Sequence, residues 1–190
     1  MPPQRPILFG IHAGINVASM TDKSEGLSQT TSAKVGFSGG VDVTLRVSPS
    51  FSIQPELNFS QMGGQEKVND PDLGNFTGKI NLDYLSLPVL VKYTVPRTGF
   101  SIYVGPQIAY LLHSSISADN LSASATGYFN KPDFSGVFGI EYYCRMGFGI
   151  PAARYQLGFT NVYNATSGLS SDPNETMKNH GFTFTLGYRF

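Results

Sequence analysis

Strict alternation between apolar and small or polar residues runs along this chain to its last residue. The final segment reads Phe182, Phe184, Leu186, Tyr188 and Phe190, separated by Thr183, Thr185, Gly187 and Arg189. Because successive side chains of a β-strand point to opposite faces, such a segment separates an apolar environment from a polar one. Termini usually fray in water, so an aromatic last residue on the apolar face predicts a final strand that is held in a sheet.

Seven further segments show the same alternation. We predict strands over residues 7–19, 34–47, 51–62, 82–95, 100–113, 133–146, 152–163 and 181–190. The apolar parity carries no charged residue in seven of the eight segments, and in segment 82–95 it carries none from Leu85 to Val95. A Lys or Arg that faces lipid at the bilayer midplane costs about 2–4 kcal/mol, so a face without charge is the pattern expected of a barrel wall in contact with lipid.

The connections between the predicted strands are alternately tight and long. The tight ones, 48–50, 96–99 and 147–151, consist of turn-forming residues. Long segments rich in Ser, Asn, Asp, Thr and Gly lie at 20–33, 63–81, 114–132 and 164–180. This order places all long loops at one end of an antiparallel barrel, as in outer-membrane barrels. The sequence predicts an all-β, eight-stranded antiparallel up-and-down transmembrane β-barrel over residues 7–190, preceded by a disordered N-terminal segment, 1–6.

The composition agrees with a membrane barrel and excludes other classes. Charged residues make up 14% of the 190 residues and the formal net charge is zero, so the chain lacks the basic footprint of a nucleic-acid-binding protein. No apolar run approaches the roughly 18 residues that a transmembrane helix needs, but a spanning strand needs only about 9–11. The single cysteine, Cys144, excludes an internal disulfide.

The opposite parity of the strands carries their charges. Eight strands enclose an interior just wide enough for side chains to fill, so we expect these residues to plug the lumen. A buried charge without a partner is strongly destabilising, and the three carboxylates are therefore expected to form ion pairs with the cations. The predicted network consists of Asp42, Arg46, Glu56, Lys92, Glu141, Arg154 and Arg189.

Two further features describe the wall of the predicted barrel. Pro55, Pro88 and Pro106 lie within strands, where a proline donates no hydrogen bond, so we expect bulges or weak pairing there. Aromatic rings near strand ends predict girdles at the lipid headgroups. The predicted girdle residues are Tyr84, Tyr93, Tyr110, Tyr155, Tyr188 and Phe190.

No residue pattern supports catalysis. The three histidines, His12, His113 and His180, lie in different predicted strands. His113 precedes Ser114, but neighbours in a strand point to opposite faces, whereas a nucleophile and its base must be adjacent in space. No ligand cluster indicates a metal site. We therefore expect no enzymatic activity, no cofactor and no metal ion.

Several segments resemble the PorT-like, porin-family outer-membrane β-barrels of Gram-negative bacteria. The matching segments are QPEL at 54–57, YLSLPVLVKY at 84–93, YVGPQ at 103–107, residues 133–142 and RYQLG at 154–158. The resemblance implies an exported, multi-pass protein of the bacterial outer membrane, so we expect a signal peptide that this sequence does not include. One branch of the family takes part in protein secretion. A last strand that ends in Tyr188 and Phe190 also resembles the closing strand that barrel assembly machinery reads in such proteins.

Several functions stay open for such a barrel. The first is a monomeric scaffold in outer-membrane lipid that presents loops 63–81 and 164–180 to an extracellular ligand or protein partner. The second is a narrow channel, and the third is a component of a secretion or assembly machine. A soluble lipocalin-like barrel is a further alternative, because parity alone does not say which face is inside.

Overall fold

Ten strands of one antiparallel sheet make up the fold in the computed structural model, which describes residues 6–24, 27–30, 32–70, 74–118, 121–124, 131–144, 149–162 and 176–190. The strands are β1 (Ile7–Ser24), β2 (Leu27–Thr30), β3 (Lys34–Arg46), β4 (Phe51–Asp70), β5 (Gly74–Thr94), β6 (Phe100–Ala118), β7 (Leu121–Ser124), β8 (Pro132–Tyr142), β9 (Ile150–Gly158) and β10 (Thr176–Arg189). Within these ranges no helix is long and apolar enough to cross a membrane.

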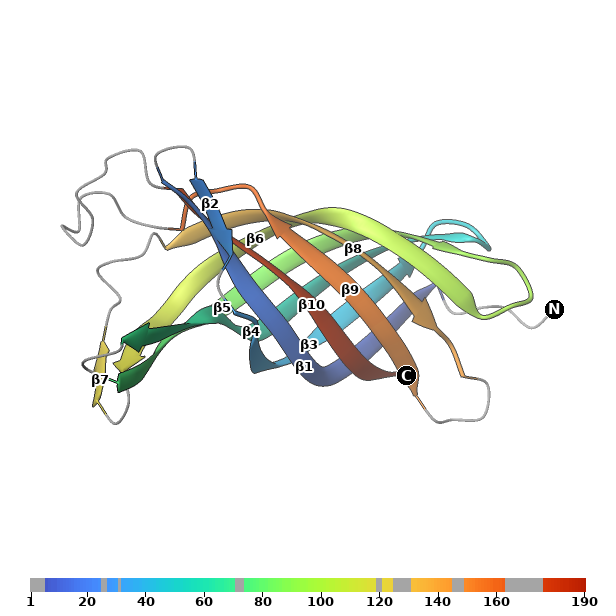
Figure 1. Ribbon diagram of the computed structural model, residues 1–190. Coiled ribbons are helices and arrows are strands. Elements are labelled where there is room, and N and C mark those ends of the chain that lie inside the picture. The colour runs from blue at the N-terminus through green and yellow to red at the C-terminus, as the bar shows by residue number, and fades with distance from the viewer. Residues whose placement is uncertain are drawn as a thin grey trace.

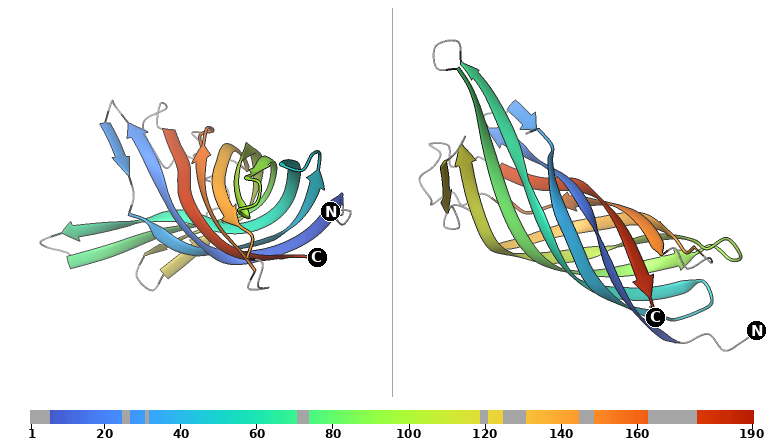
Figure 2. Two further views of the ribbon diagram at one scale, coloured as in Figure 1. Left: turned by 90° about the vertical axis from the view of Figure 1, so that its right-hand side faces the viewer. Right: turned by 90° about the horizontal axis from the view of Figure 1, so that it is seen from below.

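Eight of the strands close into a ring (Figures 1 and 2). The order around the ring is β1-β3-β4-β5-β6-β8-β9-β10, and β10 pairs with β1 from Gly10–Arg189 to Lys23–Thr176 to close it. The two short strands pair beside the ring, β2 with β1 and β7 with β6. The predicted eight-stranded up-and-down barrel is confirmed.

The two parities of the strands face opposite sides of the wall. Large apolar side chains point outward and are about half exposed, for example 51% for Ile15 and 53% for Phe138. Charged side chains point inward and are buried, with 5% exposure for Asp42 and 2% for Lys92. An apolar outside and a polar inside are the arrangement of a barrel in lipid. The lipocalin-like alternative is therefore wrong, because it requires the aromatic face to line the interior.

Tight turns close the end of the barrel that holds the C-terminus. Between β3 and β4, the Val47 N–H donates to the Phe51 carbonyl at 2.9 Å, and the Ser48 hydroxyl accepts from the Phe51 N–H at 3.0 Å. The predicted turn at 147–151 is described only from Gly149 onward, because residues 145–148 lie outside the described part of the chain. In outer-membrane barrels the end with short turns is the periplasmic one.

The turn between β5 and β6 holds a strained residue. Arg97 has a φ of 69°, and the Thr98 N–H donates to the Val95 carbonyl at 3.3 Å across it. This is the third position of a turn that normally takes glycine or asparagine. A larger residue in the left-handed region costs about 1–3 kcal/mol and persists only where its surroundings hold it.

The other end of the barrel corrects the prediction of a long loop over residues 63–81. Strands β4 and β5 stay paired from Gly63–Asn81 to Asp70–Gly74, and only 71–73 lie outside the described residues. This ribbon extends past the ring, since β3 pairs with β4 only as far as Ser60 (Figure 2). Backbone pairing between strands needs no apolar alternation once the strands leave the membrane, which is why the polar sequence suggested a loop.

The remaining predicted loops also contain strand. Strand β1 runs to Ser24, β6 to Ala118, and β10 begins at Thr176, inside the segment predicted as loop 164–180. The rest of that segment, up to 175, lies outside the described residues.

The three prolines within the wall coincide with interrupted pairing on neighbouring strands. Pro55 is the last paired residue before an interruption between β4 and β5, and pairing resumes at Asn58. Pro88 is the last before an interruption between β5 and β6, which spans Pro106, and pairing resumes at Val91. The prediction of weak pairing at these residues is confirmed.

The assignment of Tyr84 to the aromatic girdles is wrong. Tyr84 points into the lumen and is 1% exposed, because it shares its parity with Ser86 and Lys92 rather than with Leu85. Of the others, Tyr93 and Tyr155 are half-buried on the outer wall, and the rest are exposed: Tyr110, Tyr188 and Phe190.

Candidate functional site

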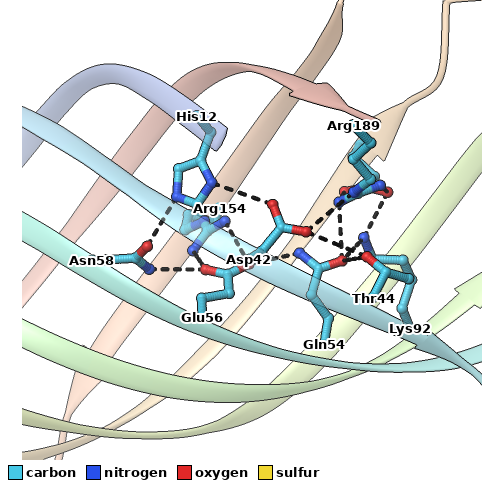
Figure 3. Close-up of polar contacts among 10 residues, drawn as sticks. His12, Asp42, Thr44, Gln54, Glu56, Asn58, Lys92, Arg154 and Arg189 are labelled. Atoms are coloured by element: carbon cyan, nitrogen blue, oxygen red, sulfur yellow. Dashed lines mark hydrogen bonds and ion pairs between the residues drawn. The ribbon is translucent and has the colours of Figure 1, made fainter. Parts of the chain in front are cut away.

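The ion-paired residues of the lumen point toward one another in one layer of the barrel (Figure 3). This layer lies in the half of the barrel nearer the tight turns. The residues come from β1, β3, β4, β5, β8, β9 and β10, so this layer links most of the ring across its interior. Alternation places one side chain of each strand at each level of the lumen, and the register then brings distant parts of the chain to the same level.

Arg189, next to the C-terminus, joins two carboxylates from other strands. Its Nε donates to Asp42 Oδ2 at 3.2 Å, and its two terminal nitrogens donate to the Glu141 oxygens at 2.8 and 3.0 Å. Lys92 Nζ lies 2.6 Å from the same Glu141 carboxylate. Gln54 Oε1 accepts hydrogen bonds from both Arg189 and Lys92. Glu141 is thus shared between two cations.

A second ion pair joins β9 to β4, where Glu56 lies opposite Asp42 of β3. Arg154 donates to both oxygens of Glu56 at 2.7 and 3.3 Å, and the Glu56 side chain is fully buried. Asn58 and Gln54 donate to the same carboxylate at 2.8 Å each. The Arg154 guanidinium also lies over the Tyr103 ring, 5.5 Å from its centroid. Bidentate geometry and extra donors of this kind offset the desolvation of a buried pair.

His12 connects the two ion-paired groups. Its Nε2 lies 2.9 Å from the Asn58 side-chain oxygen and its Nδ1 lies 3.6 Å from Asp42 Oδ1. The predicted network did not include His12, although His12 has the parity of the inner face. The register could have indicated it, because His12 faces Gly40 and Gly187 on the two neighbouring strands, which leave room for its ring.

The structure brings together six of the seven residues of the predicted network. Arg46, the seventh, lies exposed at the end of β3, at the mouth of the barrel. Between the paired residues lies a cavity of only about 20 Å³, which is room for about one water molecule. This layer therefore fills the lumen rather than lining a water path.

The half of the lumen nearer the long connections is filled by apolar side chains. Ala18, Met20, Met62, Leu82, Tyr84, Ala109 and Leu111 form one buried cluster, against which Ile80, Ile116 and Met177 pack. The strand predictions did not assign this cluster. A signal was present in the sequence, since Met20, Met62 and Leu82 continue the inward parity beyond the last charged residues.

A buried polar group borders this apolar cluster. Asn179 donates to Asp133 Oδ2 and to the Tyr84 hydroxyl, each at 3.2 Å, and the Thr160 hydroxyl donates to Asp133 Oδ1 at 2.7 Å. These contacts tie β8, β5 and β10 to the segment that follows β9. Their role is to hold the rim from which the long connections leave the barrel.

The histidines do not form a complete catalytic group in the described residues. Ser19 Oγ lies 2.9 Å from His180 Nε2, but the other ring nitrogen faces the Thr21 hydroxyl at 3.4 Å, where a hydrolase triad has a carboxylate or amide. His113 is exposed, whereas Ser114 is buried. Within the described ranges, no three His, Cys, Asp or Glu side chains group as metal ligands.

Comparisons with known proteins agree with this geometry. NspA, a Neisserial surface protein, matches with a TM-score of 0.57 and 10% identity over 96% of this chain and 97% of its own. Ail, the attachment invasion locus protein of Yersinia pestis, matches with a TM-score of 0.51 and 15% identity over 96% and 98%. Identities this low show the fold alone. No curated protein sequence matches.

A family model covers most of the chain. The model described as the outer membrane protein beta-barrel domain matches residues 2–164, which include all strands of the ring except β10. The match agrees with the apolar outer face, the filled polar interior and the closed ring. The chain belongs to the outer membrane protein beta-barrel family and is a multi-pass barrel of the bacterial outer membrane.

Proposed function

We propose that this barrel is a rigid scaffold that presents its β4–β5 ribbon, residues 63–81, to a partner outside the cell. The observation that carries the proposal is the length of these strands, 20 residues for β4 and 21 for β5. About 9–11 residues suffice to span the membrane, so roughly half of each strand is available to project from it. The ribbon is widened by β6, which pairs with β5 as far as Ala118, and by β7.

The filled lumen favours the scaffold function over the channel function. The ion-paired layer leaves a cavity of about 20 Å³, and the apolar cluster fills the other half. The barrel then acts as a support that fixes the position of the ribbon, as rigid frameworks do for binding loops elsewhere. The likeness to Ail, an attachment invasion locus protein, supports attachment as the kind of binding.

The experiment replaces residues 65–79 by Asn-Gly, which joins the paired residues Gly64 and Ile80 through a tight hairpin turn. Gram-negative cells that display either the full chain or this shortened chain are then measured for adhesion to epithelial cell monolayers. The proposal expects adhesion only with the full chain, while both proteins shift in mobility on unboiled gels. Equal adhesion by both folded proteins contradicts it.

A matched control keeps the ribbon and changes another connection. Residues 125–130, between β7 and β8, are replaced by a Gly-Ser segment of the same length. This variant should adhere like the full chain if the ribbon is the binding element. Single-channel conductance on the same preparations tests the channel alternative, for which the filled lumen predicts no stable current.

The PorT-like motifs support a second candidate, a component of a secretion machine. Such a component holds a stable protein partner, so a pull-down of the full chain in mild detergent should retain one at a fixed ratio. The scaffold proposal expects the chain to purify as a monomer.

The C-terminal strand supports assembly by the barrel assembly machinery. Phe190 is bonded to Phe9 through both backbone groups, at 2.9 and 3.3 Å, so the last residue belongs to the closing seam. We infer that Tyr188 and Phe190, both exposed on the outer face, are the residues that the machinery contacts. Replacing Phe190 by Ser should lower the amount of folded protein in the outer membrane while leaving refolding in detergent unchanged.

A further inference from the structure

The outer wall of the barrel is hollowed where β1, β10, β9 and β8 run side by side (Figure 1). The volume of this first hollow is about 560 Å³, within the range of about 300–1,000 Å³ that is typical of small-molecule sites. Ala13 and Ala153 line it with short side chains, and Ala153 lies directly between Phe184 and Ile140 of the neighbouring strands. The large apolar residues that line it are Ile15, Phe100, Ile140, Tyr142, Phe184 and Leu186.

The first hollow reaches the main chain of the wall. Successive side chains of a strand point to opposite faces, yet Gly14, Ala152 and Thr185, which have the inward parity, also line this hollow. Inward side chains do not reach the outer surface, so these residues line it with backbone atoms. Ala13 and Ala153 are too short to cover that backbone, and the outer surface is therefore recessed here.

A second hollow lies beside the first, on the other side of Leu186. Its volume is about 400 Å³, and Ala13 and Leu186 line both hollows. Leu186 is 57% exposed and forms the ridge between them. Gly149, which also lines the second hollow, has a φ of 94°, and a Cβ added there would lie 3.0 Å from Leu186 Cδ1. Any larger residue at this position would therefore press against the ridge.

Both hollows begin at the turn end of the wall. Tyr142, the last residue of β8, lines the first hollow, and Tyr188, near the end of β10, lines the second. Exposed tyrosines at strand ends lie at the level of the lipid headgroups. The first hollow extends from there to Ile15, near the middle of β1. The hollows thus run from the headgroup level toward the membrane interior, which is the course of an acyl chain.

We propose that the two hollows hold the two acyl chains of one phospholipid of the periplasmic leaflet, with Leu186 between the chains. The wall belongs to an outer-membrane barrel and faces lipid, so an acyl chain is the apolar group available at this depth. Each chain gains dispersion contacts with the recessed wall. Once the first chain is in place, the second is held near its own hollow, which strengthens binding. The site does not depend on the proposed scaffold function.

The test folds the full chain into vesicles of phosphatidylethanolamine and phosphatidylglycerol, extracts it in a mild detergent and counts the retained lipids by native mass spectrometry. The unchanged barrel should retain one phospholipid. Ala13→Phe places a ring where the hollows meet, and Ala153→Leu fills the first hollow alone, so each variant should lose the retained lipid. Val41→Phe, on the outer face of β3 and lining neither hollow, is the matched control and should keep it. All three positions have the outward parity, so the variants are expected to fold, which mobility on unboiled gels checks.

A lipid with a single chain tests the pairing of the two hollows. Lysophosphatidylethanolamine, offered in the same amount, should be retained about tenfold less or weaker still, because it lacks the linked second chain. Three results overturn the proposal: no phospholipid on the unchanged barrel, equal retention by Ala13→Phe and Val41→Phe, or equal retention of the one-chain lipid. A complex of two chains without lipid also overturns it and assigns this face to a second copy of the barrel.

Discussion

The two halves of the lumen are filled by opposite chemistries. The half nearer the tight turns, or turn half, holds the ion-paired carboxylates and cations, with Glu141 bound to both Lys92 and Arg189. The half nearer the long connections, or loop half, holds an apolar cluster around Met20 and Leu82, both fully buried. The same strands build both halves. Ion pairs require specific partners at specific angles, whereas apolar side chains of similar volume replace one another at small cost. The turn half therefore specifies which strands meet, and the loop half seals the lumen.

The largest effect is expected from a variant that disrupts the ion pairs of the turn half. Glu141→Ala leaves Lys92 and Arg189 buried without their shared carboxylate, which should lower the free energy of unfolding by about 3–5 kcal/mol. The measurement is urea unfolding in lipid vesicles, followed by far-UV circular dichroism and by gel mobility without boiling. An unfolding midpoint equal to that of the unchanged protein would show that Asp42 and Gln54 suffice to hold both cations.

A control for this prediction replaces a whole pair. The double variant Glu56→Leu with Arg154→Leu removes both charges, and replacing a buried pair by apolar residues of similar volume is often neutral. The single variant Glu56→Leu should be strongly destabilised by comparison, because it leaves Arg154 unpaired. If both variants lose equal stability, packing rather than charge compensation governs this half.

The second prediction tests the loop half. Leu82→Ala opens a cavity in the apolar cluster and should cost about 3 kcal/mol. Leu85 lies on the same strand but on the outer face of the wall. Leu85→Ala should cost only about 0.5 kcal/mol, because lipid fills the space that is left. Urea midpoints of the two variants give the comparison directly. Similar losses for both would contradict the separation of inner and outer faces.

Much of this architecture was predictable from the sequence, and the exceptions have physical causes. Alternation and loop lengths predicted the ring, because a period of two directly reports which residues share a face. The network was predictable in membership, since few charges are available inside. Which residues pair with one another was not predictable, because Arg189 meets Asp42 and Glu141 through a register that only the folded ring establishes.

The failures lie where the membrane no longer constrains the chain. The ribbon at 63–81 was predicted as loop, because outside lipid neither face of a strand needs to be apolar. Tyr84 was assigned to a girdle from its residue type, although its parity pointed inward. Arg46 has the inward parity and lies exposed at the strand end, where the lumen opens.

A smaller effect is expected at the border between the two halves. Tyr84→Phe removes the hydroxyl that accepts a hydrogen bond from Asn179 at 3.2 Å and leaves the ring in the apolar cluster. The expected loss is about 1 kcal/mol, the net value of a typical hydrogen bond. Urea unfolding measures it, with Tyr110→Phe on the exposed outer face as control. A loss as large as that of Leu82→Ala would place Tyr84 with the charged network instead.

The smallest effect is a gain, and it concerns the mouth of the turn half. Arg97→Gly removes the side chain that strains the β5–β6 turn and should stabilise the barrel by about 1 kcal/mol, after the added chain entropy of glycine is subtracted. Arg97→Ala removes the same charge but keeps the strain at a φ of 69°, so it should give no gain. The difference between the two urea midpoints isolates backbone strain from the loss of the Arg97 charge. If glycine destabilises the barrel, the arginine side chain holds the turn, and its contacts outweigh the backbone strain.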